Sequence, residues 1–304
     1  MSYKTILVHL DEHPRRAERL APAFTLAARF DAHLIALFAL EATRIPSYAL
    51  AEAGPLVEEI EARRRAEAAR AAEAELHQAE RRADAKAEWR LSTADALAAL
   101  RLSARYADLV VAGQPEDPSG QAFAAELVLG AGRPVLFVPY AGRFADAGKR
   151  VLVAWNASRE AARAVSDALP LLACADAVEI VAFAPGGDHG EPPAADIALY
   201  LARHGVKATA ARDVAPGIDI GARILTRAAN ADADLIVMGA YGHSRLRELA
   251  LGGATRTLLE AMTVPVLMAH RCARAGSTMN MRPTSACAAS ARPRPRRSRR
   301  QRRP

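Results

Sequence analysis

The sequence of 304 residues repeats its strand pattern at an offset of about 145 residues. The run Lys4–Asp11 (KTILVHLD) corresponds to Lys149–Asn156 (KRVLVAWN). In both places an alanine-rich amphipathic segment and then a second apolar strand follow. Short, continuously apolar strands that alternate with helical stretches are typical of parallel sheets covered by helices on both faces. The repeat therefore limits the chain to two similar α/β units in succession.

The two halves correspond again further along the chain, where Tyr106–Gly113 (YADLVVAG) matches the end of Asn230–Gly239 (NADADLIVMG). We therefore predict two tandem doubly wound α/β domains, at residues 1–140 and 149–270. The main difference between them is residues 51–90, a stretch rich in Ala, Glu and Arg with opposite charges at helical spacing. This composition predicts a long solvated helix.

Residues 271–304 contain eleven arginines and no acidic residue, so the net charge of +7 describes the rest of the chain poorly. Without them, 30 Lys and Arg residues remain against 34 Asp and Glu residues, which makes residues 1–270 mildly acidic. We predict that 271–304 is a disordered arginine-rich tail. Two interpretations stay open: the tail binds polyanions such as nucleic acid, or it is an extension without function.

The compartment is predicted from what the sequence lacks. The first residues lead directly into an apolar strand and do not resemble a secretory signal. No apolar run approaches the roughly 20 residues of a membrane span. The three cysteines have neither metal-ligand spacing nor an even number for disulfides. We expect a cytoplasmic protein with no bound metal centre and no membrane partner.

The strongest local motif is the strand Ala233–Gly239, which runs into Gly242 and is followed by Gly252 and Gly253 at a predicted helix start. Glycines let the backbone approach an anion, and the unpaired N–H groups of a first helical turn point at it. The pattern indicates a nucleotide-binding site, although glycines can also serve tight turns alone.

No catalytic residue is predicted. The glycines are not followed by the Lys and Ser/Thr of a P-loop ATPase. The sequence also has no nucleophile elbow and no paired-histidine zinc motif. We expect a protein that is not an enzyme, with weak ATP hydrolysis as an alternative.

These runs resemble the universal stress protein family over residues 3–140 and 149–270. The spacing Gly239-x2-Gly242-x9-Gly252 is similar to the ATP-binding signature of the family's nucleotide-binding members, and Met238–Arg247 is a typical family phrase. The resemblance implies, for each domain, a five-stranded mostly parallel sheet with helices on both faces. It also implies a nucleotide-binding regulatory module that acts in the stress response through its C-terminal domain.

The resemblance further implies ATP, alone or as its Mg complex, at the carboxyl ends of the strands. It assigns adenine and ribose contacts to Trp155, Asn156, Ala157 and Phe183, closure of the pocket to Met238 and Gly239, and phosphate contacts to Gly242, Gly252, Gly253, Ala254 and Thr255. Packing is an equally open interpretation for Trp155. The protein partner that would sense the nucleotide is not identified by the sequence.

The sequence departs from the family pattern at two of these positions. Asn156 stands where the family has Asp, and Gly253 stands where it has Ser or Thr. Both departures favour the alternative that the protein binds no nucleotide and has a structural or interaction role.

The first half departs further. Glu116 replaces the second glycine of the motif, and Pro115 and Pro118 lack N–H donors. Glu116 and Asp117 would also repel phosphate. We predict that the first domain is a structural partner with a degenerate nucleotide motif.

Assembly is predicted from two apolar edge strands, Pro134–Val138 and Pro265–Met268. Proteins seldom leave such edges unpaired. We expect them to pair within one chain as an intramolecular pseudo-dimer, or between two chains as a homodimer.

Overall fold

The central strands form where the sequence is continuously apolar, and the described strands join in one sheet. The computed structural model describes residues 2–41, 47–184, 194–214, 219–242 and 253–270. Within these ranges the strands are β1 (Thr5–Leu10), β2 (His33–Phe38), β3 (Glu88–Leu91), β4 (Leu109–Gly113), β5 (Val135–Val138), β6 (Arg150–Trp155), β7 (Ala177–Ala184), β8 (Ala208–Val214), β9 (Leu235–Gly239) and β10 (Val266–Ala269).

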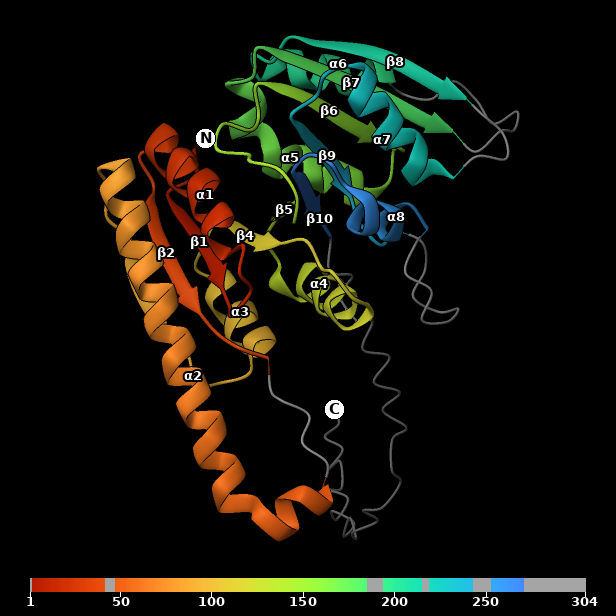
Figure 1. Cartoon of the computed structure of the whole chain (residues 1–304). Helices are drawn as coiled ribbons and strands as arrows, with labels where there is room; N and C mark the ends of the chain where they lie inside the picture. Colours follow the sequence, from red (N-terminus) through yellow and green to blue (C-terminus); the bar gives the residue numbers. More distant parts are fainter. Residues whose placement is uncertain (1, 42–46, 185–193, 215–218, 243–252, 271–304) are drawn as a thin grey trace, which may run out of the picture. The chain divides into compact units, whose positions relative to one another are not determined.

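Helices alternate with these strands in the described ranges, except between β5 and β6 (Figure 1). They are α1 (Arg16–Phe30), α2 (Ser47–Ala83), α3 (Ala96–Ala104), α4 (Pro118–Ala131), α5 (Arg159–Ala173), α6 (Ala194–Arg203), α7 (Ile220–Asn230) and α8 (Gly253–Ala261). No helix within the described ranges combines the length and apolar character that crossing a membrane requires. Cys174 is a free thiol.

The strand order is β3-β2-β1-β4-β5-β10-β9-β6-β7-β8, so the second half repeats the first in mirrored sequence along the sheet. All neighbouring strands are parallel except β5 and β10, which pair antiparallel with Leu136 opposite Leu267. The predicted α/β class and the predicted pairing of the two apolar edge strands are both confirmed. Met1–Cys272 form one compact unit. The division into separate domains at residues 140 and 149 stays a prediction.

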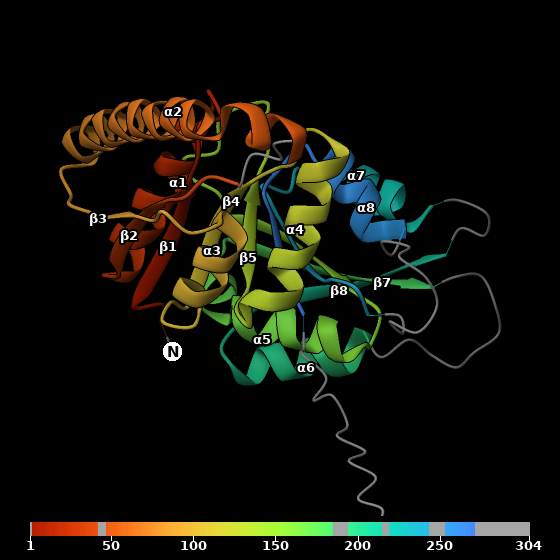
Figure 2. The same cartoon turned by 90° about the horizontal axis from the view of Figure 1, so that it is seen from below.

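The helices divide between the two faces of the sheet. One core cluster contains buried residues of α1, α2, α5 and α6, and the other contains buried residues of α3, α4, α7 and α8. Figure 2 shows α3 beside α4 and α7 beside α8 on the second face. Both faces are covered, which explains why the central strands lack alternating polar residues.

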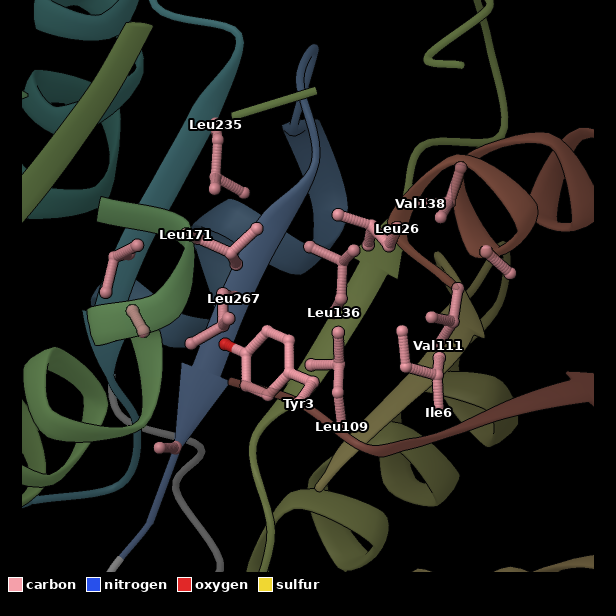
Figure 3. Packing of buried hydrophobic residues seen from close by; sticks show 14 of the residues in the cluster. Tyr3, Ile6, Leu26, Leu109, Val111, Leu136, Val138, Leu171, Leu235 and Leu267 are labelled. Carbon is pink, nitrogen blue, oxygen red and sulfur yellow. The ribbon is translucent and has the colours of Figure 1, made fainter. Parts of the chain in front are cut away.

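The core is continuous across the junction of the two halves. Leu136 of β5 and Leu267 of β10 lie side by side in the packed interior, beside Tyr3 (Figure 3). The hydroxyl of Tyr3 donates a hydrogen bond of 2.7 Å to the carbonyl oxygen of Asp167 in α5. The first half is therefore tied to a helix of the second by both apolar packing and a polar contact.

A repeated aspartate holds the start of the central strands in each half. Asp108 accepts a hydrogen bond of 2.7 Å from the backbone N of Lys4, and Asp234 accepts hydrogen bonds from the backbone N atoms of residues 148–150, each at 3.0 Å. These aspartates are the ones that the sequence repeat aligns. The repeat therefore extends from the apolar pattern to individual polar contacts.

The expected helix over 51–90 is confirmed only as far as Ala83. Asp84 has a φ of 49°, a left-handed conformation that ends the helix, and Glu88–Leu91 forms the edge strand β3. An edge strand has one hydrogen-bonded neighbour and is partly exposed, so it does not need an apolar sequence. Residues 271–304, the predicted tail, lie outside the described residues.

Candidate functional site

The carboxyl ends of β6 and β9 lie at the same edge of the sheet, because these strands are parallel neighbours with Ala154 opposite Met238. Residues 155–157 follow at the end of β6, and Gly239–Gly242 follow at the end of β9. This is the edge at which open α/β sheets bind ligands. The predicted residue Gly252 lies outside the described residues.

No side chain fits at Gly239, because the first turn of α5 packs against the end of β9. A Cβ atom at this position would lie 2.3 Å from the backbone N of Ala161 and 2.4 Å from the carbonyl carbon of Glu160. The helix start is fixed by Ser158, whose hydroxyl accepts a hydrogen bond of 3.1 Å from the N–H of Ala161. Gly239 is thus required by helix packing, independently of any ligand.

The residues after Gly239 form a turn with an unsatisfied polar group. Tyr241 has a φ of 58°, and its buried hydroxyl has no hydrogen-bond partner in the described part of the chain. Burial raises the pKa of this hydroxyl, so it stays protonated and can donate. Gly242 is exposed, and a Cβ atom there would lie 3.0 Å from Oε2 of Glu160.

The start of α8 lies close to the start of α7. A Cβ atom at Gly253 would lie 3.6 Å from Oδ1 of Asp219, the residue that caps α7. The helices approach closely at Gly221, where a Cβ atom would lie 3.0 Å from the carbonyl oxygen of Ala254. Gly253 is exposed, Ala254 is half-buried and Thr255 is buried. The first-turn N–H groups of α8 have no acceptor within their own helix.

Asn156 forms a local turn at the end of β6. Its Oδ1 accepts a hydrogen bond of 3.1 Å from the backbone N of Ser158, and Ala157 between them has a φ of 57°. Both Asn156 and Ala157 are exposed. The amide oxygen therefore supports the α5 start while the residue faces solvent at the edge.

The large apolar residues that the resemblance assigns to the nucleotide pocket do not share one face of the sheet. Trp155 packs in the core under α5 and α6, whereas Phe183 and Met238 pack under α7 and α8. The indole N–H of Trp155 is buried without a hydrogen-bond partner in the described part. The structure thus places Phe183 and Met238 on one face of the sheet and Trp155 on the opposite face.

A buried arginine accompanies Phe183. The guanidinium carbon of Arg223 lies 5.6 Å from the centre of the Phe183 ring, and Nη2 of Arg223 lies 2.5 Å from Oδ1 of Asp213. Sequence analysis assigned no role to Arg223, because its position in α7 gives no spacing that connects it with β7 or β8. Sequence analysis also assigned no role to Tyr241 and Glu160. Glu160 lies near the residues that follow β9 only because of where α5 starts.

The first half has a cavity of about 590 Å³ at the equivalent edge, where β1, β2 and β4 end. Its floor includes His9, Ala39 and Phe123, and the His9 and Phe123 rings stack with centres 5.7 Å apart. The sequence predicted a degenerate motif here but gave no sign of a cavity. Residues of α2 and α4 form part of its lining, and the motif does not predict where these helices lie.

A buried ion pair forms one wall of this cavity. Arg19 donates two hydrogen bonds to the carboxylate of Asp11, at 2.6 and 2.9 Å, and one of 3.1 Å to the carbonyl oxygen of His9. Burial alone would raise the pKa of Asp11, but the charge and hydrogen bonds of Arg19 outweigh it and hold this pKa well below its usual range. A Cβ atom at Gly113 would lie 3.0 Å from Nε of Arg19.

The phosphate-type features of the first half are replaced, as the sequence indicates. Asp117 caps α4 by accepting a hydrogen bond of 2.7 Å from the backbone N of Gly120. Pro118 begins the helix and has no N–H, and Glu116 lies 3.0 Å from Nε2 of His13. The start of α4 therefore presents carboxylates where an anion site would present donors.

Comparison with known proteins agrees with this architecture. Residues 148–270 match the model of the Universal stress protein family. A universal stress protein from Archaeoglobus fulgidus DSM 4304 is similar in structure, with a TM-score of 0.67 and 16% identity over 88% of this chain and 96% of that one. A functionally unknown protein from Pseudomonas aeruginosa PAO1 has a TM-score of 0.53 and 16% identity over 88% and 92% of the two chains.

The structural likenesses show a shared fold at this level of identity. The search of the curated proteins found no match to this sequence. Residues 148–270 therefore match the universal stress protein family model, and the described chain shares the fold of a universal stress protein.

Proposed function

We propose that the second half binds an adenine nucleotide, ATP, and acts as a regulatory module in the stress response without catalysing a reaction. The family match of residues 148–270 supports the stress-response role. In this proposal the protein works in the cytoplasm, and a partner protein senses whether the surface around Gly239 and Gly242 is occupied.

Residues 240–242, which follow β9, are the observation that carries the proposal. They include the buried hydroxyl of Tyr241, a donor without a partner among the described residues, and the exposed Gly242, which has no side chain of its own. A buried polar group without a hydrogen bond costs free energy, on the order of 1–3 kcal/mol. A ligand with acceptor oxygens would remove that cost, and phosphate groups supply such oxygens.

The phosphates would bind near the start of α8, where the N–H groups of Gly253 and Ala254 lie in the first turn. Two carboxylates border this region, since Glu160 approaches Gly242 and Asp219 approaches Gly253. Negative charges this close would oppose a free triphosphate. We therefore assign the Mg complex of ATP, in which the divalent cation offsets part of that repulsion.

The proposal is tested by equilibrium dialysis of the purified full chain against ATP with and without Mg²⁺. We expect binding in the presence of Mg²⁺, weaker binding in its absence, and about a tenfold loss in Gly242→Val, which places a side chain against Glu160. Gly54→Ala is the matched control, because a Cβ atom there meets nothing within 4 Å. Absence of binding by the unmodified chain, or equal binding by Gly242→Val, would refute the proposal.

A second candidate function is an interaction role without a nucleotide, which the local hydrogen bond of Asn156 favours. Its Oδ1 accepts from Ser158 and so has one lone pair fewer for a ribose hydroxyl. In this case dialysis shows no ATP binding. Nucleic-acid retention would then be compared between the full chain and the compact unit Met1–Cys272, because loss of retention in the shorter chain assigns binding to the tail.

A further inference from the structure

The cavity of the first half lies at the carboxyl ends of β1, β2 and β4, away from the site proposed for ATP. Its volume of about 590 Å³ is in the range of small-molecule sites. Apolar and aromatic surface from Ala39, Leu40, Ala112 and Phe123 forms part of the lining. The cavity can therefore accept an organic molecule rather than a single ion.

The charge of the lining is strongly negative. Six carboxylates face two guanidinium groups and two imidazoles. The carboxylates belong to Asp11, Glu12, Glu41, Glu61, Glu116 and Asp117, the guanidinium groups to Arg19 and Arg64, and the imidazoles to His9 and His13. Among the carboxylates and guanidinium groups, the lining carries four more negative than positive charges. Arg64 pairs with Glu12 and Glu61, and His13 contacts Glu116, but these pairs leave the excess of negative charge unchanged, so the cavity attracts cations.

The donors that would hold an anion are already used or missing. The carboxylate of Asp117 occupies the start of α4 through its hydrogen bond from Gly120, and Pro115 and Pro118 have no N–H. The guanidinium of Arg19 makes its hydrogen bonds to Asp11 and to the backbone. A phosphate would meet carboxylates at this edge, so the ligand differs in charge from the one proposed for the second half.

A buried histidine lines the same space. The His9 ring lines the cavity, is 5% exposed as a residue, and donates from Nε2 to the carbonyl oxygen of Ala39 at 3.0 Å. Its Nδ1 is therefore an acceptor, and no described residue donates a hydrogen bond to it. Burial lowers the pKa of His9, which keeps the ring neutral and Nδ1 available. An N–H group of a cationic ligand is the partner that this atom can accept.

The absence of a metal-binding cluster among the described residues favours an organic cation over a metal ion. No three His, Cys, Asp or Glu side chains of the described residues gather in a way that would hold a metal. A polyamine needs carboxylates spread along its length and an apolar surface for its methylene groups. Phe123 and His9 provide that surface, and Glu61 and Glu116 are carboxylates from α2 and from the segment before α4.

We infer that the first half binds a small organic cation with at least two ammonium or guanidinium groups joined by an apolar chain. Such a ligand would place one N–H group at Nδ1 of His9 and its other charge among the carboxylates of Glu61 and Glu116. The two halves would then have ligands of opposite charge, so the first half is a binding unit in its own right.

The test is isothermal titration of the full chain with spermidine at low salt, where surface charges are weakly screened. We expect one spermidine per chain. The double variant Glu61→Gln, Glu116→Gln should raise Kd about tenfold. Glu67→Gln is the matched control, because Glu67 lies on α2 and pairs with Arg63 outside the cavity, and it should leave Kd within about twofold.

A variant with the opposite sign separates charge from folding defects. Arg64→Gln removes a positive charge from the lining, and we expect it to lower Kd about threefold or more, which a damaged fold would not do. Absence of binding, an unchanged Kd in the double variant, or displacement of spermidine by equimolar Mg²⁺ would overturn the inference. Gly242→Val should leave spermidine binding unchanged. The spermidine test and the ATP test are therefore independent of each other.

Discussion

The same strand end is closed in two different ways in the two halves of the molecule. At Gly239 the backbone of α5 comes within 2.3 Å of a hypothetical Cβ atom, whereas at Gly113 the nearest group is the side chain of Arg19, at 3.0 Å. The helix start explains the difference. α5 begins three residues after Asn156, but α1 begins five residues after Asp11.

Because α1 starts two residues later, its backbone does not pack against Gly113 at the end of β4. The guanidinium group of Arg19 lies there instead. That group holds Asp11 and borders an acidic cavity. In the second half α5 packs directly against the strand end, and beyond it lies the Tyr241 hydroxyl, which has no hydrogen-bond partner among the described residues. The position of one helix start, rather than the strands, separates the chemistry of the two halves.

The largest effect is expected from Arg19→Met, which removes the buried partner of Asp11. The side chains of Arg19 and Asp11 are 5% and 28% exposed. Breaking a buried pair leaves an uncompensated charge and typically costs about 3–5 kcal/mol. Urea denaturation should show a loss of this size. Arg29→Met on the same helix is the control, because its pair with Asp146 is more exposed and should cost less than about 1 kcal/mol.

The same pair gives an acid dependence with a definite sign. Because the pKa of Asp11 is lower in the folded chain, its contribution to stability is present above the unfolded pKa, about 3.9, and is lost as pH falls toward the folded pKa. Arg19→Met should remove this dependence. Equal losses of stability on acidification in the variant and the unmodified chain would contradict the role assigned to the pair.

The second effect compares the two glycines directly. Gly239→Ala places a Cβ atom against backbone that cannot move without shifting α5, and overpacking of this kind costs roughly 3 kcal/mol. Gly113→Ala meets the guanidinium group of Arg19 at 3.0 Å rather than helix backbone, and this group need move only a few tenths of an ångström, so we expect about 1 kcal/mol or less. Thermal and urea unfolding of both variants measure the difference. Equal destabilisation would show that the strand ends at Gly239 and Gly113 tolerate an added Cβ atom equally well.

The repeat made the central strands predictable because they are buried on both faces and so need continuous apolar runs. It did not predict the edge strands β3 and β8, whose sequences Glu88–Leu91 and Ala208–Val214 are partly polar. An edge strand is partly exposed, so it needs no apolar pattern, and it forms by pairing with the adjacent strand. A single sequence does not show which strand that will be.

The candidate site was predictable only where a backbone position requires glycine. Gly239 and Gly242 follow from spacing, but Tyr241, Arg19 and His9 act through distances set by helix starts and by packing. Side chains that meet across helices leave no regular spacing in the sequence. The cavity of the first half was missed for this reason, since its walls come from elements far apart in the chain.

The smallest effect concerns the residue after each glycine. Gln114 and Ala240 make equivalent backbone bonds, to the carbonyl oxygens of Val138 and Ala269. Gln114 also donates from its side chain to the carbonyl oxygen of Leu259, at 2.9 Å, near the end of α8. The last carbonyls of a helix have no partner within it, so Gln114 joins the first half to the second by capping α8.

Gln114→Ala should therefore cost about 1–2 kcal/mol, because a buried carbonyl loses its donor. Gln121→Ala is the control, since Gln121 reaches the exposed carboxylate of Glu260 on the same helix and should change stability by less than about 0.5 kcal/mol. Hydrogen exchange should rise at the end of α8 in the first variant only. Equal effects of the two variants would mean that this asymmetric contact does not help to hold the two halves together.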